Sequence, residues 1–322
     1  KLDSSDNYIW AKNFGGTGYD EGNDIDIDTN GNIYIAGTFY ENASFGDVNI
    51  TAKGLSDAFA AKLDNNGNCV WAKSAGSSFS DIGSGIAVDF SGNVFLAGSF
   101  YQKAYFDGNT IDAEGYDDAF LAKLDNNGNW LWYKPAGGDQ FDYSNGVKVD
   151  SAGNAYLFGS FEDDGVFGAI VAVSSGNDDG FIAKINAGGT WQWVAQCGGS
   201  SWFDRVYDIW IKNSNEIYAC GSFSNLADFD AFKIPSKGST DAFLGKINGS
   251  GAWQWVNSYG NSGMDIAYSI DADADNYLYL TGMFSETVDF SGEQISSAGE
   301  GDVFLMQTDE AGNMSWVAHA GG

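Results

Sequence analysis

The sequence predicts an all-β protein, a β-propeller whose blades are four-stranded antiparallel sheets. The first observation is an internal repeat of 61 or 62 residues. Its clearest marker is a recurring tryptophan: Trp71, Trp132, Trp193, Trp255 and Trp316. The second observation is that each period reads as two β-hairpins, without helical periodicity. Four antiparallel strands repeated in series are typical of propeller blades.

The tryptophan belongs to a family of columns, by which we mean equivalent positions that recur with the same period. One aspartate column is Asp20, Asp81, Asp142, Asp204 and Asp265, and a second is Asp57, Asp118, Asp179, Asp241 and Asp302. The phenylalanine columns are Phe39, Phe100, Phe161, Phe223 and Phe284, and Phe45, Phe106, Phe167, Phe229 and Phe290. A glycine column is Gly37, Gly98, Gly159, Gly221 and Gly282. Their joint recurrence indicates one structural unit used five times.

The first hairpin of a repeat gives the strands that we call a and b. In the first repeat, Ile25 and Ile27 alternate with polar residues, and the sequence Thr29-Asn30-Gly31 then predicts a turn. The return strand, residues 33–39, is apolar on both faces, which suits a strand buried between two layers.

The second hairpin gives strands c and d. It covers residues 58–71 and turns at Asn66-Gly67, a strong signal for a tight β-turn. With alternating chain direction, the a–b and c–d turns are expected at one edge of each sheet. The d–a and b–c connections are expected at the other edge.

We expect a single propeller domain over residues 1–322. Its repeats cover approximately 17–77, 78–138, 139–199, 200–261 and 262–322, and residues 1–16 add the end of a strand c and a strand d. Five innermost strands predict five blades, or a larger ring if the natural chain continues. A β-sandwich array or a β-helix is the alternative, but sandwich domains rarely repeat this evenly and β-helix coils are much shorter.

Composition excludes several classes of function. The net charge of −29 repels phosphate backbones, so nucleic acid is not expected as a partner. No apolar run is long enough for a transmembrane segment. Three cysteines cannot form a disulfide framework, and the single histidine, His319, leaves little room for histidine-based catalysis.

Two stretches carry a resemblance to a known family. Residues 28–37 and 123–132, and the sequence Asp-Ala-Phe followed by Lys-Leu-Asp, resemble the SBBP-type β-propeller repeat. Such proteins are similar to large secreted or surface proteins of Bacteroidetes, many of them exported by the type IX secretion system. The resemblance implies an extracellular or cell-surface protein, with type IX secretion components as possible partners. It implies no shared activity.

The candidate binding residues are aromatic side chains at the edge that carries the d–a and b–c connections. The b–c segments, residues 40–56, 101–117, 162–178, 224–240 and 285–301, are long and variable, and we expect them to be loops. The candidates are Tyr19, Tyr40, Tyr101, Tyr116, Phe141, Trp202 and Phe203. Such rings could stack on sugars or hold a protein partner. The alternative is packing between neighbouring blades.

The candidate metal ligands are the first aspartate column: Asp20, Asp81, Asp142, Asp204 and Asp265. A ring of these carboxylates at the mouth of a channel would attract Ca²⁺, which prefers oxygen ligands. The alternative is structural, because an Asp before a strand commonly accepts hydrogen bonds from backbone N–H groups. We expect that no cofactor is required and that Ca²⁺ is the ion that these carboxylates could bind.

We expect an exported, non-enzymatic propeller that displays a variable loop face for glycan or protein binding, as in adhesion. One alternative is a structural segment of a larger surface adhesin or filament. The other is a carbohydrate-active enzyme, a glycosidase or lyase, for which a pair of carboxylates suffices. The acids that break the repeat are Glu114, Glu162, Glu216, Glu286 and Glu300, and none forms an evident pair. We therefore assign no catalytic residue.

Overall fold

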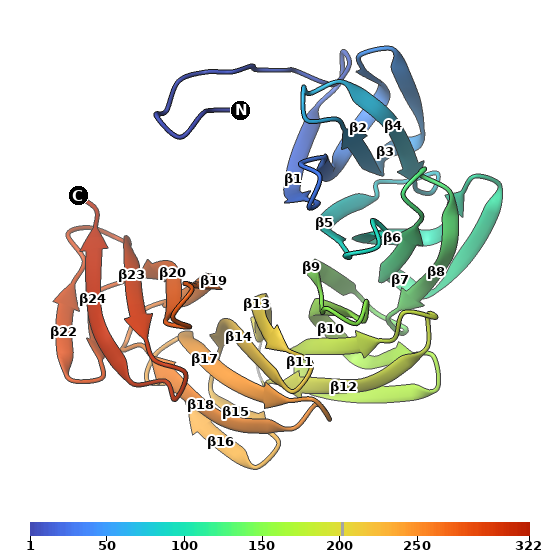
Figure 1. Cartoon of the computed structure of the whole chain (residues 1–322). Coiled ribbons are helices and arrows are strands. Elements are labelled where there is room, and N and C mark those ends of the chain that lie inside the picture. The colour runs from blue at the N-terminus through green and yellow to red at the C-terminus, as the bar shows by residue number, and fades with distance from the viewer. Residues whose placement is uncertain (201–202) are drawn as a thin grey trace. The chain divides into compact units, whose positions relative to one another are not determined.

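The computed structural model describes residues 1–200 and 203–322, and these residues form strands and no helix (Figure 1). The all-β class is therefore confirmed. None of the described residues builds a helix that could span a membrane. The chain divides into two compact units, residues 1–137 with 141–155, and residues 138–140 with 156–322. The single domain over residues 1–322 stays a prediction.

The first unit holds two complete four-stranded antiparallel sheets and one further strand. The first sheet has β1 (Asp20–Ile27), β2 (Ile33–Phe45), β3 (Val48–Leu63) and β4 (Cys69–Ala75), hydrogen-bonded in that order. The second has β5 (Ile82–Val88), β6 (Val94–Phe106), β7 (Asn109–Leu124) and β8 (Trp130–Ala136), again in chain order. The further strand is β9 (Asp142–Val149). Strands a to d of the sequence thus become four neighbours in a meander.

The second unit repeats this plan, with shorter middle strands in its last two sheets. It holds β10 (Ala155–Phe167), β11 (Ile170–Ile185) and β12 (Trp191–Cys197). One complete sheet has β13 (Arg205–Asn213), β14 (Glu216–Phe223), β17 (Asp241–Asn248) and β18 (Trp253–Tyr259). The other has β19 (Ile266–Ala272), β20 (Leu278–Phe284), β23 (Asp302–Thr308) and β24 (Met314–Ala320). Two-stranded ribbons join the middle strands: β15 (Leu226–Phe229) with β16 (Phe232–Pro235), and β21 (Thr287–Phe290) with β22 (Glu293–Ser296).

The b–c connections are regular β-ribbons, and the expectation of long loops was wrong. Strands β2 and β3 stay paired from Asn42 and Thr51 to Phe45 and Val48, so only two residues form the turn. Gly46 takes a positive φ of 67° there, which glycine adopts without strain. The physical reason is burial: Ala43 and Phe45 are buried while Ser44 between them is exposed, which is the alternation of a half-buried strand.

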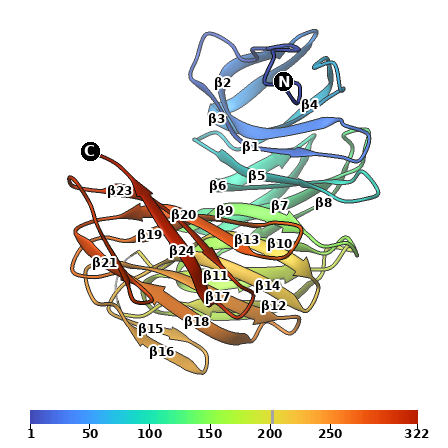
Figure 2. The ribbon, with the colours of Figure 1, turned by 60° about the vertical axis from the view of Figure 1, so that its left-hand side comes forward.

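Within each unit, consecutive sheets lie next to one another (Figure 2). Apolar side chains pack between them. In the first unit, Tyr34 and Ala60 of one sheet share a buried cluster with Leu96, Phe100 and Phe106 of the next. In the second unit, Tyr218 and Leu244 join Leu280 and Phe284 in the same way. Both phenylalanine columns are buried throughout, as their recurrence predicts.

The tryptophan column docks one sheet onto the next rather than filling a core. Trp71 is buried, but Trp132, Trp193, Trp255 and Trp316 are only partly so. The indole Nε1 of Trp71 donates to the carbonyl of Asn126 at 3.1 Å, in the c–d turn of the neighbouring sheet. Trp193 donates in the same way to Gly249 at 2.9 Å.

Residues 1–16 form no strand d, in contrast to our expectation. They make isolated bridges between Leu2 and Tyr8 and between Gly15 and Ser44. In the other repeats, strand d pairs with a full strand c. Here only Lys1 and Leu2 correspond to residues of strand c. Trp10 nevertheless occupies its usual place, since its Nε1 donates to the carbonyl of Asn65 at 3.3 Å.

Candidate functional site

The first aspartate column holds the edge of each sheet together. Asp204 accepts hydrogen bonds from the backbone N–H of Gly199 at 2.8 Å, in the d–a loop, and of Ser224 at 2.7 Å, after strand b. Asp20, Asp81 and Asp265 accept the equivalent pair of bonds. The carboxylate thus takes two backbone donors that would otherwise lack partners.

Burial distinguishes this column from an open ring of carboxylates. Asp81, Asp142, Asp204 and Asp265 are buried, and Asp20 is partly exposed. Burial raises the pKa of Asp81 to about 7 and of Asp204 and Asp265 to about 6. Among the described residues, no three His, Cys, Asp or Glu side chains gather as a metal site. Ca²⁺ binding by this column stays a prediction.

The second aspartate column lies inside or at the start of strand c and is buried too. Asp57 accepts two bonds of 3.1 Å from the backbone N–H of Lys53, four residues earlier. Burial raises the pKa of Asp118 and Asp179 to about 7. One oxygen of each, Oδ1, has no hydrogen-bonding partner within the described residues. Burial without a donor for this oxygen favours the neutral, protonated form of the carboxyl group.

The aromatic candidates of the first unit come together in three groups at the predicted edge. Tyr19 and Tyr40 meet edge to face, with ring centroids 6.1 Å apart. Phe79, from the next d–a loop, meets Tyr101 in the same manner at 4.5 Å. Tyr19 is 65% exposed and Phe79 is 41% exposed, so both pairs reach solvent.

The third group is a row of parallel rings. Phe141 stacks on Tyr116 with centroids 5.0 Å apart and an interplanar angle of 10°, and on Tyr143 at 6.3 Å and 14°. Tyr116 is 48% exposed, so the outer ring is open to solvent. The hydroxyl of Tyr143 donates to Asp117 at 3.5 Å. Sequence reasoning found Tyr116 and Phe141 but missed Tyr143.

The remaining aromatic candidates belong to the second unit. Phe203 is 57% exposed and has a positive φ of 75°. Trp202 lies outside the described residues. The second unit has an aromatic pair of its own, since Tyr207 meets Tyr268 edge to face with ring centroids 5.2 Å apart and Tyr268 is 44% exposed.

The cysteines, His319 and the acids that break the repeat make contacts within the sheets. Cys197 and Cys220 are buried free thiols, and burial raises the pKa of the Cys69 thiol to about 11. His319 packs against Phe284, with Nδ1 3.7 Å from Asp302. Among the acids that break the repeat, Glu216 accepts from Lys246 at 2.7 Å, which lowers its pKa. A general acid needs the opposite shift.

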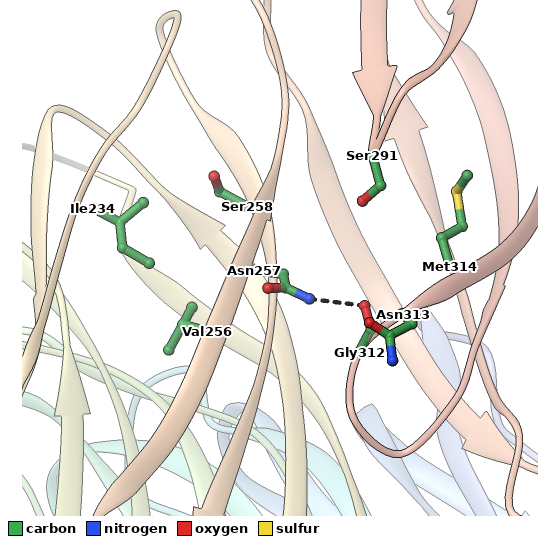
Figure 3. Close-up of a pocket in the computed structure, with 8 residues that line it drawn as sticks. All are labelled: Ile234, Val256, Asn257, Ser258, Ser291, Gly312, Asn313 and Met314. Carbon is green, nitrogen blue, oxygen red and sulfur yellow. Dashed lines mark hydrogen bonds between the residues drawn. The ribbon is translucent and has the colours of Figure 1, made fainter.

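A groove that sequence reasoning missed lies in the second unit (Figure 3). It has a volume of about 600 Å³. It is lined by Ile234, Val256, Asn257, Ser258, Ser291, Gly312, Asn313 and Met314. These residues come from β16, β18, the turn before β22, and the turn into β24. No repeated column marks it, because the positions of Asn257, Ser291 and Met314 vary among the repeats.

Comparison with known proteins supports the repeat type. A model of the beta-propeller repeat called SBBP matches residues 9–38 and 70–99. This match and the four-stranded antiparallel sheets support the repeat type that the sequence predicts.

One curated relative is an uncharacterised WD repeat-containing protein of Acanthamoeba polyphaga mimivirus, 24% identical over 299 residues. The match takes in 82% of this chain and 18% of that protein, so the chain spans about a fifth of its relative's length. A solved structure of a protein of unknown function from Bacteroides caccae is 11% identical, with a TM-score of 0.49 over 98% of this chain and 87% of that chain.

Proposed function

We propose that this chain is a non-enzymatic binding module that holds a glycan or a protein through aromatic side chains at one edge of its sheets. The observation that carries the proposal is the row of parallel rings formed by Tyr116, Phe141 and Tyr143. Burying an exposed ring against a ligand gains apolar area and fixed geometry at a small cost in side-chain entropy. Two more exposed aromatic groups at the same edge make the surface multivalent.

The rigid support beneath the rings favours binding over a packing role. Tyr101 follows Phe100, and its backbone N–H donates to the buried Asp81 at 3.1 Å. Phe141 directly precedes the buried Asp142. The rings therefore stand on anchored backbone, and preorganised side chains lose less entropy when a ligand binds.

We also propose the architecture and the location of this binding module. We take the five repeats as blades of one five-bladed ring, exported to the cell surface or the extracellular space. Blade-to-blade packing that recurs within each unit supports the blades. The resemblance noted in residues 28–37 and 123–132 supports export, with type IX secretion components as transient partners.

The test is a glycan array and a pull-down from extracellular material, followed by titration calorimetry with each ligand found. Tyr116→Ser removes the outermost ring of the row. We expect it to weaken binding at least tenfold, about 1.4 kcal/mol. Tyr8→Ser is the matched control, because Tyr8 is 84% exposed and lies in the N-terminal segment. Equal affinity of wild type, Tyr116→Ser and Phe79→Ser for every ligand would overturn the proposal.

A specific observation favours a second candidate, a structural segment of a larger assembly. Val303 and Leu305 on β23 are 55% and 43% exposed. Their equivalents on β17, Ala242 and Leu244, are buried against the following sheet. The face of the last sheet has the chemistry of a blade interface, and a blade of the same repeat would fit it.

A further inference from the structure

From the groove of the second unit (Figure 3) we infer a binding site for a neutral saccharide, separate from the aromatic edge. In the first unit, a contact between neighbouring sheets closes the same place. There, Lys73 on β4 makes an ion pair of 2.6 Å with Asp107, in the turn between β6 and β7.

The groove lies at the equivalent junction of the second unit, where shorter side chains stand in the places of Lys73 and Asp107. Asn257 pairs with Leu244 as Lys73 pairs with Ala60, so Asn257 is the equivalent of Lys73. Ser291 follows Phe290 as Asp107 follows Phe106. Both members of the ion pair are thus replaced by shorter, uncharged residues, and the space they would fill is open.

A third replacement enlarges the opening. Met314 begins β24, whereas the equivalent strands β8, β12 and β18 begin with Trp130, Trp191 and Trp253, and β4 begins with Cys69. Trp130 packs edge to face on Phe106 at 5.0 Å, and Trp253 packs on Phe229 at 5.1 Å. Methionine leaves part of that volume empty. The shorter side chains of Asn257, Ser291 and Met314 together leave this junction open.

The lining sets the chemical class of the ligand. The eight lining residues carry amide, hydroxyl and apolar groups and no charge. The Nδ2 of Asn257 donates to the carbonyl of Gly312 at 2.9 Å, which fixes the orientation of this amide. Asn313 is fixed as well, since its Nδ2 donates to Asp309 at 2.8 Å. Amide and hydroxyl groups beside Val256 and Met314 match the mixed polar and apolar faces of a sugar ring.

The groove is not suited to a charged ligand. An anion finds no cationic side chain in the lining and meets the field of a chain with net charge −29. A cation finds no carboxylate in the lining. The volume of about 600 Å³ lies within the usual range of ligand pockets, about 300–1,000 Å³. It has room for more than a single small solute.

The experiment restores the ion pair. The double variant N257K/S291D rebuilds the Lys73–Asp107 arrangement in the groove, and Met314→Trp fills the groove by a second route. The control K73N/D107S removes the original ion pair and leaves the groove untouched. The probes are three trisaccharides: cellotriose and mannotriose, both neutral, and trigalacturonate, which is anionic. Binding is measured by saturation-transfer NMR and calorimetry on the whole chain.

We expect a neutral probe to bind wild type and K73N/D107S alike. We expect N257K/S291D and Met314→Trp, both with melting temperatures close to wild type, to bind it at least tenfold more weakly. Tyr116→Ser should leave this affinity unchanged, which separates the groove from the aromatic edge. Binding of trigalacturonate alone, binding of no probe, or full affinity in both groove-filling variants would overturn the inference.

Discussion

The carboxylate of Asp24 on β1 accepts a hydrogen bond of 2.8 Å from the backbone N–H of Ile86 on β5, across the junction of two sheets. Asp26 does the same for Val88 at 2.7 Å. In the second unit, Asp208 accepts from Ile270 at 3.1 Å. Asp24, Asp26 and Asp208 are therefore docking groups for the next innermost strand.

The first prediction concerns this docking bond. Asp24→Ala leaves the N–H of Ile86 without its acceptor in a half-buried junction, so unfolding should become easier by about 1–3 kcal/mol. Thermal or urea unfolding measures this loss. Asp6→Ala, in the exposed N-terminal segment, is the control and should stay within about 0.5 kcal/mol of wild type. An Asp24→Ala protein as stable as wild type would contradict the docking role.

The second prediction separates capping from Ca²⁺ binding in the first aspartate column. Asp204→Ala deprives Gly199 and Ser224 of their acceptor and should destabilise by about 1–3 kcal/mol. The loss should be equal in EDTA and in millimolar Ca²⁺, since capping involves no ion. Calorimetric melts in both conditions provide the comparison. A rise in wild-type stability with Ca²⁺ that disappears in Asp204→Ala would show that the column binds the ion.

The third prediction is a loss of stability as pH rises. Burial raises the pKa of Asp81, Asp118 and Asp179 to about 7, whereas an unfolded Asp titrates near 3.9. Between about pH 4 and pH 7 the folded chain holds protons that the unfolded chain has released. The free energy of unfolding must therefore fall as pH rises through this window and level off above it.

Asp118→Asn tests the origin of this slope. The amide resembles the protonated carboxyl group, so the variant should lose less stability than wild type between pH 4 and pH 7. Asp64→Asn is the control, because hydrogen bonds from the backbone N–H and side chain of Asn68 lower the pKa of Asp64 and its effect falls below about pH 4. Urea unfolding at several pH values gives the slopes. Identical slopes for wild type and Asp118→Asn would refute the assignment.

Much of the fold follows from the sequence because the repeat supplies its own internal comparison. The columns located the strands and the fully buried residues, and Phe39 and Phe45 are both core. The sequence does not predict the ribbons, because an alternation as short as that of Ala43 and Phe45 does not distinguish a strand from a loop. A two-residue turn such as Gly46-Asp47 gives little sequence signal on its own.

The candidate sites were predicted less well than the fold. Single columns indicated which aromatic residues are exceptional, and Tyr116 and Phe141 do lie together. The groove depends on residues from three columns that meet only when two sheets pack. Asn257, Ser291 and Met314 lie far apart in the chain, so no local pattern brings them together. The role of Asp24 was likewise hidden, because its partner Ile86 lies one full repeat later.

The fourth prediction concerns the source of stability. Phe161 is buried and packs edge to face on Phe181 at 6.2 Å. Phe161→Ala should therefore cost about 3–5 kcal/mol and lower the melting temperature. Dithiothreitol should leave the melting temperature of wild type unchanged, because all three cysteines are free. A marked fall in dithiothreitol would mean that a disulfide contributes.

The last prediction compares two equivalent leucines of the second unit. Leu244 on β17 is buried between sheets, and Leu305 on β23 is 43% exposed. An unpaired carboxylate is costly in a buried junction and tolerated in water, so Leu244→Asp should destabilise by more than about 3 kcal/mol and Leu305→Asp by less than about 0.5 kcal/mol. Urea unfolding of the isolated chain at several concentrations measures both. If Leu305→Asp destabilises as strongly as Leu244→Asp, or if it changes the mass of the particle in light scattering, the outer face of β23 is covered in solution. That outcome would favour the structural segment over the independent binding module, because a face that is already occupied by another blade is the property expected of one stretch within a longer array.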